Sequence, residues 1–413
     1  MSKEKGNMKL EPELRFPGFR EDWDVMQLHE LGNLINGLTY SPKDVRDKGL
    51  LVLRSSNVRN GKIYLDDCVY VKTDIKGANQ SEPNDILICV RNGSKRLIGK
   101  NALIPKGMPL STHGAFMTVF RTKIPLFIFQ LFQSESYRRQ VKADLGATIN
   151  SINGKNFIKY EFGIPPKPKE QQKIAATLTS LDNLIAPENE KLDALQAHKK
   201  GLLQQLFPAK GEKVPKLRFG EFSGEWEETT LSKLGDLING LTYSPKDVRE
   251  KGLLVLRSSN VQNGQIDLKD CVFVRPDTKG ANLSLPDDIL ICVRNGSKRL
   301  IGKNAIIPKE MPLSTHGAFM TMFRAKLSKF VFQLFQTEAY NRQVKADLGA
   351  TINSINGKNF LKYEFIVPKD PKEQLRIADC FSSLDDLIAV QSEKIQSLKE
   401  HKKGLMQQMF PIV

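Results

Sequence analysis

Cysteine is scarce in this sequence, and long apolar runs are absent. The five cysteines among 413 residues include no CxxC pair, so we expect no zinc site built from closely spaced ligands. We expect all five to be buried, reduced thiols of a cytoplasmic protein. No apolar stretch approaches the roughly 18 residues that span a bilayer. Residues 1–16 contain Lys3 and Lys5 but no apolar stretch, and no signal peptide is expected there.

The signatures of catalysis and cofactor binding are also missing. Gly93–Asn101 reads GSKRLIGKN, but a phosphate-binding loop needs four residues between its glycines and Ser or Thr after the lysine. There is no nucleophile elbow and no HExxH, no Asn-Pro-Pro-aromatic stretch of the amino-methyltransferase kind, and no clear acidic nuclease core. The sequence therefore predicts no catalytic residue, no metal site and no cofactor in this chain.

Acidic residues are outnumbered by basic ones. There are 62 Lys and Arg against 46 Asp and Glu, which gives a net charge of +16. Such a surplus favours a polyanionic partner, with nucleic acid first. A membrane surface also attracts cations, and a basic surface without a partner is the plainer alternative.

What the sequence does contain is one unit written twice. LICVRNGSKRLIGKNA at Leu87–Ala102 returns unchanged at Leu290–Ala305, and matching residues lie 203 positions apart. The match closes at KKGLLQQLFP (199–208) and KKGLMQQMFP (402–411). A period this long indicates two tandem modules and not a solenoid. Either the fold needs the same turn twice, or the chain contacts two equivalent places on one partner.

Each module is expected to begin with a mixed, strand-rich part. Residues 50–58 (LLVLRSSNV) and 85–90 (DILICV) are apolar β-type runs. NGK at 60–62 and NGS at 92–94 are turn signals. Residues 126–145 have apolar positions near helical spacing and predict one helix.

The second part of each module is expected to be one long helix. Pro168 stands near a favoured first-turn position, and apolar residues then recur at steps of three and four, as in a coiled-coil seam. In the two copies these residues are Ile174, Leu178, Leu181, Ile185, Leu192, Leu195, Leu202 and Leu206, and Ile377, Phe381, Leu384, Ile388, Ile395, Leu398, Leu405 and Met409. Such helices are roughly 55–60 Å long, and we expect them to pack antiparallel. Pro187 should kink or break the first helix.

This pattern predicts an α/β (α+β) architecture with two tandem strand-rich domains and two long helices. The predicted boundaries are 1–22 for an N-terminal segment, 23–165 and 226–368 for the strand-rich domains, 166–208 and 369–413 for the helices, and 209–225 for a linker.

Polar and basic segments of each module are candidate contacts with DNA. Arg pairs well with guanine and Asn with adenine, whereas Lys and Ser hold phosphates. In the first module the candidates are Tyr40, Lys43, Arg54, Ser56, Asn57, Arg91, Asn92, Ser94, Lys95, Arg96, Thr148, Asn150, Ser151, Asn153 and Lys155. In the second they are Tyr243, Lys246, Arg257, Ser259, Asn260, Arg294, Asn295, Ser297, Lys298, Arg299, Asn353, Ser354, Asn356 and Lys358.

Each candidate also has a plainer interpretation. An Asn-Gly pair is a turn before it is a base reader. Tyr40 either stacks on a partner or caps a core. His113 is expected to be structural, and His198 and His401 lie in lysine-rich helix ends and should be solvated.

Several motifs resemble the specificity subunit of type I restriction–modification enzymes. They are LRF…W before each module, at 12–23 and 215–226, the pattern EQ.(K/R)IA…LD.LI within 166–185 and 371–388, and the two KKGL helix ends. The resemblance covers nearly the whole chain. It implies two target-recognition domains that enter the major groove of double-stranded DNA, and an antiparallel coiled coil that acts as a ruler. The first long helix of this family is usually uninterrupted, and Pro187 is a departure from that pattern.

The resemblance also implies partners. Two adenine-N6 methyltransferase subunits would dock on the helices, restriction/translocase subunits would join them, and those subunits would use S-adenosylmethionine, ATP and Mg. This chain would have no catalysis, and its near-identical domains would read a symmetric, bipartite site. The alternatives are a stand-alone tandem DNA-binding regulator and an enzyme that carries its own nuclease or methyltransferase.

Overall fold

The computed structural model describes residues 10–145, 150–348 and 353–413 of the chain. It divides into two compact units: Met1–Asn189 with Glu393–Val413, and Glu190–Ser392. Each unit contains one copy of the repeated strand-rich module. The described helices include none that is long and apolar enough to cross a membrane.

The centre of the first module is an antiparallel sheet in the order β2-β11-β8-β9. These strands are β2 (Gly32–Asn36), β11 (Met117–Thr122), β8 (Ile86–Cys89) and β9 (Asn101–Leu103). Successive side chains of a strand point to opposite faces, and both faces of β8 are covered. Ile86 and Ile88 join one buried cluster with the helices, whereas Leu87 and Cys89 join another. The strand predicted within 85–90 is therefore confirmed.

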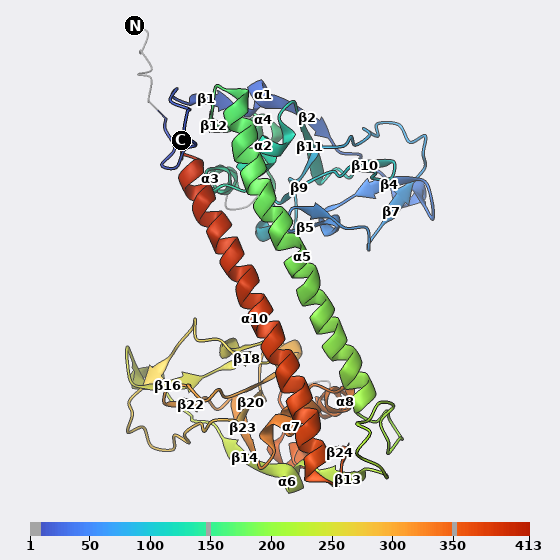
Figure 1. The fold of residues 1–413 in the computed structure, drawn as a ribbon, viewed down its shortest axis with the longest axis vertical. Coiled ribbons are helices and arrows are strands. Elements are labelled where there is room, and N and C mark those ends of the chain that lie inside the picture. The colour runs from blue at the N-terminus through green and yellow to red at the C-terminus, as the bar shows by residue number, and fades with distance from the viewer. Residues whose placement is uncertain (1–9, 146–149, 349–352) are drawn as a thin grey trace. The chain divides into compact units, whose positions relative to one another are not determined.

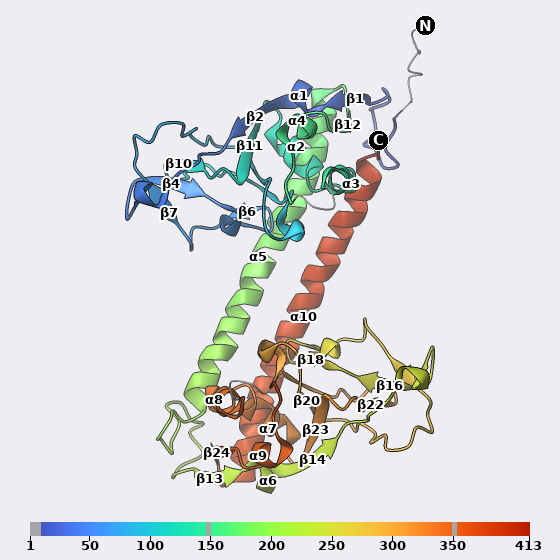
Figure 2. The same cartoon turned by 180° about the vertical axis from the view of Figure 1, so that it is seen from behind.

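A second sheet has the order β10-β4-β7-β3. Its strands are β10 (Ser111–His113), β4 (Leu50–Leu53), β7 (Val69–Val71) and β3 (Val45–Arg46). Both views show β10, β4 and β7 on the side of β2 and β11 away from α5 (Figures 1 and 2). Because β10 and β4 are parallel, with His113 opposite Leu53, both strands end at the same edge.

The strand predicted at 50–58 is shorter than expected. After β4 the chain forms a 3-10 turn, Ser55–Asn57, and then β5 (Val58–Arg59), which pairs with β6 (Lys62–Ile63). The predicted NGK turn joins β5 to β6. Asn60 and Gly61 adopt φ values of 50° and 74°, as the favoured two-residue hairpin requires.

The single helix predicted at 126–145 is two helices. They are α2 (Pro125–Leu131) and α3 (Glu135–Asp144). The Ser134 hydroxyl accepts a hydrogen bond from the Tyr137 amide at 3.3 Å. This N-cap starts a new helix where the apolar periodicity suggested continuity. The remaining elements of this module are β1 (Asp24–Gln27), α1 (Leu28–Leu31), α4 (Gly154–Phe157) and β12 (Glu161–Ile164). The strand β12 pairs with β1.

The second module repeats this arrangement. Its helices are α6 (Leu231–Leu234), α7 (Ser328–Leu334), α8 (Glu338–Asp347) and α9 (Gly357–Phe360). Its strands are β13 (Glu227–Thr230), β14 (Gly235–Asn239), β15 (Val248–Arg249), β16 (Leu253–Leu256), β17 (Val261–Gln262), β18 (Gln265–Ile266), β19 (Phe273–Val274), β20 (Ile289–Cys292), β21 (Asn304–Ile306), β22 (Ser314–His316), β23 (Met320–Ala325) and β24 (Glu364–Val367). The sheet orders β14-β23-β20-β21 and β15-β19-β16-β22 correspond to those of the first module.

The two predicted long helices are α5 (Pro168–Leu206) and α10 (Pro371–Met409). In the first unit the Lys402 ammonium lies 2.6 Å from Asp182, and Lys394 lies 2.5 Å from Glu188. Because residue numbers rise along one helix as they fall along the other, these segments are antiparallel. In the second unit Lys199 pairs with Asp385 at 2.5 Å, which is the same ion pair in the other copy.

Pro187 does not break the first helix, contrary to expectation. The helix α5 continues through this residue to Leu206. Proline removes one amide donor from the helix interior, but Pro187 is exposed, so water can reach the backbone there. Two residues later, the Asn189 side chain donates to the Ile185 carbonyl at 2.7 Å. This bond adds to the backbone ladder beside the proline.

The helix ends complete the cores of the two units. Met406, Met409 and Phe410 are buried in the cluster that contains β8 and α2 of the first module. Leu206 and Phe207 are buried in the equivalent cluster of the second module. The division between the compact units therefore falls within both long helices.

The LRF…W motif stabilises the fold through hydrogen bonds to a buried glutamate. The Arg15 guanidinium donates to both oxygens of Glu170 at 2.8 and 3.0 Å, and the Trp23 indole donates to Glu170 at 3.4 Å. Glu170 is almost fully buried, and a buried carboxylate is tolerated when it is paired and hydrogen-bonded. Arg218 forms the same bonds with Glu373 in the second unit. The motif thus fastens the segment before each module to the start of its long helix.

Candidate nucleic-acid interface

Segments from five parts of the first module meet at one edge of its sheets. Val90 and Arg91 donate backbone hydrogen bonds to the Phe116 carbonyl at 3.0 and 3.1 Å. The Gly114 amide donates to Leu53 at 3.0 Å, and the Leu38 amide donates to His113 at 2.7 Å. We call this group the loop cluster, and it comprises residues 37–40, 53–57, 91–96, 113–116 and 150–155.

The strands of the loop cluster approach so closely that one position requires glycine. A Cβ atom built on Gly37 would lie 2.2 Å from the carbonyl oxygen of Gly114. The same clash, at 2.3 Å, would arise between Gly240 and Gly317. The glycine at the start of GLTYSPKDVR therefore serves a close backbone approach.

Arg91 is an exposed cation of the cluster. Its guanidinium lies 5.7 Å from the centroid of the Phe116 ring, a cation–π distance. Its backbone forms an isolated bridge with Ser151. The structure thus brings two of the predicted segments, 91–96 and 150–155, side by side.

Asn92 organises the basic turn that follows. Its side-chain oxygen accepts from the Ser94 amide at 3.0 Å, and its amide group donates to the Ser55 hydroxyl at 3.0 Å. Lys95 and Arg96 lie in the next 3-10 turn and are exposed, as is Ser94. The predicted turn at 92–94 is confirmed, and it holds the backbone of the cations in place.

Two predicted base readers are not available for that role. Asn57 is fully buried. Its oxygen accepts from the Arg54 amide at 2.9 Å, and its nitrogen donates to two backbone carbonyls at 2.9 and 3.0 Å. Asn260 is buried and bonded in the same way. Both side chains stabilise the turn after the strand, so we withdraw them as DNA contacts.

Several other candidates also have structural partners. Arg54 forms a 2.7 Å ion pair with Asp67. Tyr40 packs against a small buried cluster, so it caps a core. The Asn153 side chain caps α4 by accepting from the Lys155 amide at 2.9 Å.

The remaining candidates differ in position. Ser56 and Lys155 are exposed within the cluster. Asn150 donates to the Gly93 carbonyl at 3.3 Å. Lys43 is exposed beside β3, at the outer edge of its sheet, and is thereby set apart from the cluster. Thr148 lies outside the described residues.

The one histidine of the cluster is buried. The Nε2 atom of His113 lies 2.9 Å from the Ile35 carbonyl, and burial lowers the pKa of the imidazole. The prediction of a structural histidine is confirmed. His198 and His401 are exposed, as expected.

The thiol of Cys89 is equally unsuited to chemistry. Burial raises the pKa of Cys89 to about 11, so the thiol is protonated at neutral pH and is a poor nucleophile. All five cysteines are free, with Cys89 and Cys292 buried and the other three only partly so. In residues 10–145, 150–348 and 353–413, no three His, Cys, Asp or Glu side chains are grouped as a metal site.

Phe116 was not among the predicted residues. It is 57% exposed although it is a large apolar side chain. In STHGAF, which occurs in both copies, the signal for this residue is the aromatic side chain that follows Gly-Ala.

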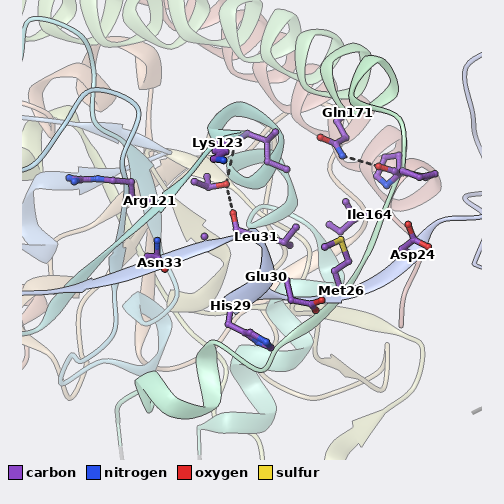
Figure 3. A pocket seen from close by; sticks show the side chains of 15 residues that line it. Asp24, Met26, His29, Glu30, Leu31, Asn33, Arg121, Lys123, Ile164 and Gln171 are labelled. Atoms are coloured by element: carbon purple, nitrogen blue, oxygen red, sulfur yellow. Dashed lines mark hydrogen bonds between the residues drawn. The ribbon is translucent and has the colours of Figure 1, made fainter.

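A cavity of about 670 Å³ lies at the other end of β2 (Figure 3). Its walls come from β1, α1, β2, β11 and the start of α5. Gln171 donates to the Pro165 carbonyl at 2.8 Å, and Arg121 forms a bidentate ion pair with Asp85. These polar groups therefore serve the fold, and the cavity is separate from the loop cluster.

The second module reproduces the cluster contact by contact. The Arg294 guanidinium lies 5.7 Å from the Phe319 ring centroid, and Arg294 bridges to Ser354. Asn295 donates to Ser258 at 3.0 Å. Lys298 and Arg299 are exposed in the corresponding 3-10 turn. Two equivalent surfaces, each with exposed cations on a fixed backbone, are suited to a polyanion with two equivalent sites.

Comparison with known families gives a match in each half of the chain. Residues 20–197 and 223–400 both match the family described as "Type I restriction modification DNA specificity domain". Each match contains one module and most of its long helix.

Named relatives agree with this match. The chain is 28% identical over 312 residues to the type I restriction enzyme EcoKI specificity subunit of Escherichia coli (strain K12), and the aligned part is 70% of this chain and 65% of that protein. The chain therefore spans just under two thirds of that relative. It is 27% identical over 418 residues to the MjaVIII specificity subunit of Methanocaldococcus jannaschii, with 97% and 94% of the two chains covered.

A solved structure has the same fold. The type I restriction–modification S subunit from M. genitalium aligns with a TM-score of 0.61 at 16% identity, over 98% of this chain and 100% of that one.

Proposed function

The chain belongs to the family of type I restriction–modification DNA specificity proteins, and from this premise we propose that its two loop clusters each bind one half of a bipartite DNA site. The observation that carries the proposal is the exposed group Arg91, Lys95 and Arg96 on a hydrogen-bonded turn, repeated at Arg294, Lys298 and Arg299. Arg reads guanine in the major groove, and Lys holds phosphates. Recognition, and not catalysis, is the role of this chain.

The two half-sites are the same sequence in inverted orientation. Identical exposed groups in the two clusters favour identical half-sites. The antiparallel pairing of α5 with α10, supported by Lys402–Asp182 in one unit and Lys199–Asp385 in the other, favours an inverted order. Proteins with pseudo-twofold symmetry bind pseudo-palindromic sites for this reason.

Two adenine-N6 methyltransferase subunits dock on the long helices. Leu184 on α5 and Leu387 on α10 are exposed at equivalent positions of the repeat. Exposed apolar side chains on a helix suit a protein partner, and two equivalent positions suit two copies of it. Restriction/translocase subunits join this assembly, and S-adenosylmethionine, ATP and Mg are used by the partner subunits.

The test is single-molecule methylome sequencing of cells that carry the chain with its methyltransferase partner. Wild type should methylate adenines on both strands of an interrupted palindrome. Arg91→Ala should impair one half-site and Arg294→Ala the other, each by about 1–3 kcal/mol of discrimination. Lys106→Ala is the matched control, because Lys106 is an exposed cation after β9, at the far end of the sheet.

Methylation unchanged in both arginine variants would contradict the proposed interface. A direct repeat in the motif would contradict the inverted order. A second measurement addresses docking: Leu184→Asp with Leu387→Asp should abolish assembly with the methyltransferase while leaving the fold unchanged. Full specific affinity without partner subunits would instead favour a stand-alone regulator. Affinity that does not change with salt would contradict the proposed phosphate contacts.

A further inference from the structure

Phe116 is an apolar side chain held outward in a polar, basic surface. It is 57% exposed, and its counterpart Phe319 is 58% exposed. The Arg91 guanidinium lies against its ring, and the exposed cations Lys95 and Arg96 belong to the same loop cluster. An exposed aromatic ring is unfavourable in water, so its repetition at the centre of both clusters points to a partner surface.

The backbone at this position is fixed. The Phe116 carbonyl accepts the amides of Val90 and Arg91, and the flanking Ala115 and Met117 amides donate to Leu38 and Gly114 at 2.9 and 2.8 Å. The ring is therefore presented by a rigid turn between β10 and β11. A rigid anchor loses little conformational entropy on binding.

Arg91 covers one side of the ring. Its guanidinium lies 5.7 Å from the ring centroid, and the distance is the same between Arg294 and Phe319. Insertion of the ring between two base pairs would need both faces and would displace the arginine. Contact through the uncovered edge or face keeps the arginine in place. The arrangement therefore favours a contact in the groove over intercalation.

The apolar group available in the major groove is the 5-methyl group of thymine. Resting on the function proposed above, we propose that Phe116 and Phe319 are specificity-determining residues, each of which contacts the 5-methyl group of one thymine in its half-site. Arg91 and Arg294 then lie beside the same base step. The half-site consequently contains at least one thymine whose methyl group is read.

The test uses the full chain assembled with its methyltransferase subunits and duplexes that carry the mapped recognition sequence. Each thymine of a half-site is replaced in turn by deoxyuridine, which removes only the methyl group. For wild type, one replacement should weaken binding about fourfold, the scale of one buried methyl group. Phe116→Ala should weaken binding to the unmodified site and should show no further loss with that replacement. Phe319→Ala should do the same for the other half-site.

Leu110→Ala is the matched control. Leu110 is an exposed apolar residue of the same module, and it precedes β10, whereas the loop cluster lies after that strand. This variant should retain the affinity and the deoxyuridine sensitivity of wild type. Circular dichroism and thermal melting of each variant test the fold.

The outcomes separate this inference from the proposed function. Equal deoxyuridine sensitivity in wild type and Phe116→Ala, or no sensitive thymine in wild type, would overturn the thymine contact. If Arg91→Ala still damages recognition in that case, the proposed interface stands. Absence of specific binding by the wild-type assembly would overturn both.

Discussion

Phe410 lies near the end of the chain, yet it completes the core of the first module. Its side chain is 3% exposed in the cluster that contains Trp23, Phe127 and Leu178. Its ring centroid lies 5.7 Å from that of Phe127. We predict that Phe410→Ala destabilises the first module, although in the sequence Phe410 follows the second module and its helix α10.

The magnitude follows from the burial. Truncation of a core phenylalanine costs about 3–5 kcal/mol, and an aromatic pair adds about 0.5–1.5 kcal/mol beyond its buried area. A loss of about 4 kcal/mol corresponds to a roughly thousandfold increase in the population of the open state, since 1.36 kcal/mol is a factor of ten. Amide hydrogen exchange in the first unit should accelerate by a similar factor where it occurs through opening of this core.

The assay is hydrogen exchange with mass spectrometry on the full chain. Phe410→Ala should remove protection from β8, whereas Phe207→Ala should remove it from β20, because Phe207 is buried in the second cluster. Ile412→Ala is a control, since Ile412 is 48% exposed. Loss of protection in β20 equal to that in β8 on Phe410→Ala, or unchanged protection in β8, would refute the reasoning.

Three further predictions concern buried polar groups. Asn57→Ala should lower the free energy of unfolding by about 1–3 kcal/mol, because backbone groups lose their partners. Ser56→Ala, on the exposed side of that turn, should change the free energy of unfolding by less than about 0.5 kcal/mol. Chemical denaturation measures the free energy of unfolding of both variants, and equal effects would restore Asn57 as a candidate DNA contact. Glu170→Gln should cost about 3–5 kcal/mol, because the nearly buried Arg15 guanidinium loses its bidentate carboxylate and keeps only Glu11 at 4.0 Å; a thermal melt like that of wild type would contradict this account of the motif. Burial lowers the pKa of His316 to about 4, below the ordinary ~6.5. As the pH falls, the unfolded chain therefore binds the proton before the folded chain does. The contribution of His316 to the free energy of unfolding is fully present above pH 6.5 and is lost between pH 6.5 and 4, with a loss of about 2 kcal/mol at pH 5. His316→Gln should make the fall of stability in this window shallower in denaturation curves, and part of the fall should remain because burial also lowers the pKa of His113 in the first module. An unchanged slope would show that other groups cause it.

Local chemistry made much of the fold predictable. The apolar run at 85–90, the NGK hairpin and the long helices follow from patterns that a few neighbouring residues determine. The break between α2 and α3 was missed because Ser134, a capping residue, stands within an apolar period that continues on both sides. The expected break at Pro187 was wrong for the opposite reason, since an exposed proline removes only one backbone hydrogen bond from a helix that packing also stabilises.

The candidate site was less predictable because it depends on how separate turns fold against one another. Nothing near Asn57 in the sequence shows that its side chain bonds the carbonyls of Tyr64 and Asp67. Residue type alone therefore ranked it with the exposed Arg91. Phe116 was missed for the converse reason, because an apolar residue is ordinarily assigned to a core. Only the structure shows it on the surface.

The differences between the modules bear on which surface reads sequence, and several of them lie on one hairpin. Arg59 pairs with Asp66 at 2.6 Å and lies over the Tyr64 ring at 5.2 Å, whereas the second copy has Gln262 and Asp267 at the positions of Arg59 and Tyr64. These differences fall on the β5–β6 hairpin and the residue after it, outside the loop cluster. A symmetric recognition site would therefore indicate that the loop cluster reads the bases, because its exposed residues are the same in both copies. An asymmetric site would require part of the reading to occur outside the cluster, with the hairpin as one candidate, because a surface that is identical in two modules cannot distinguish two half-sites.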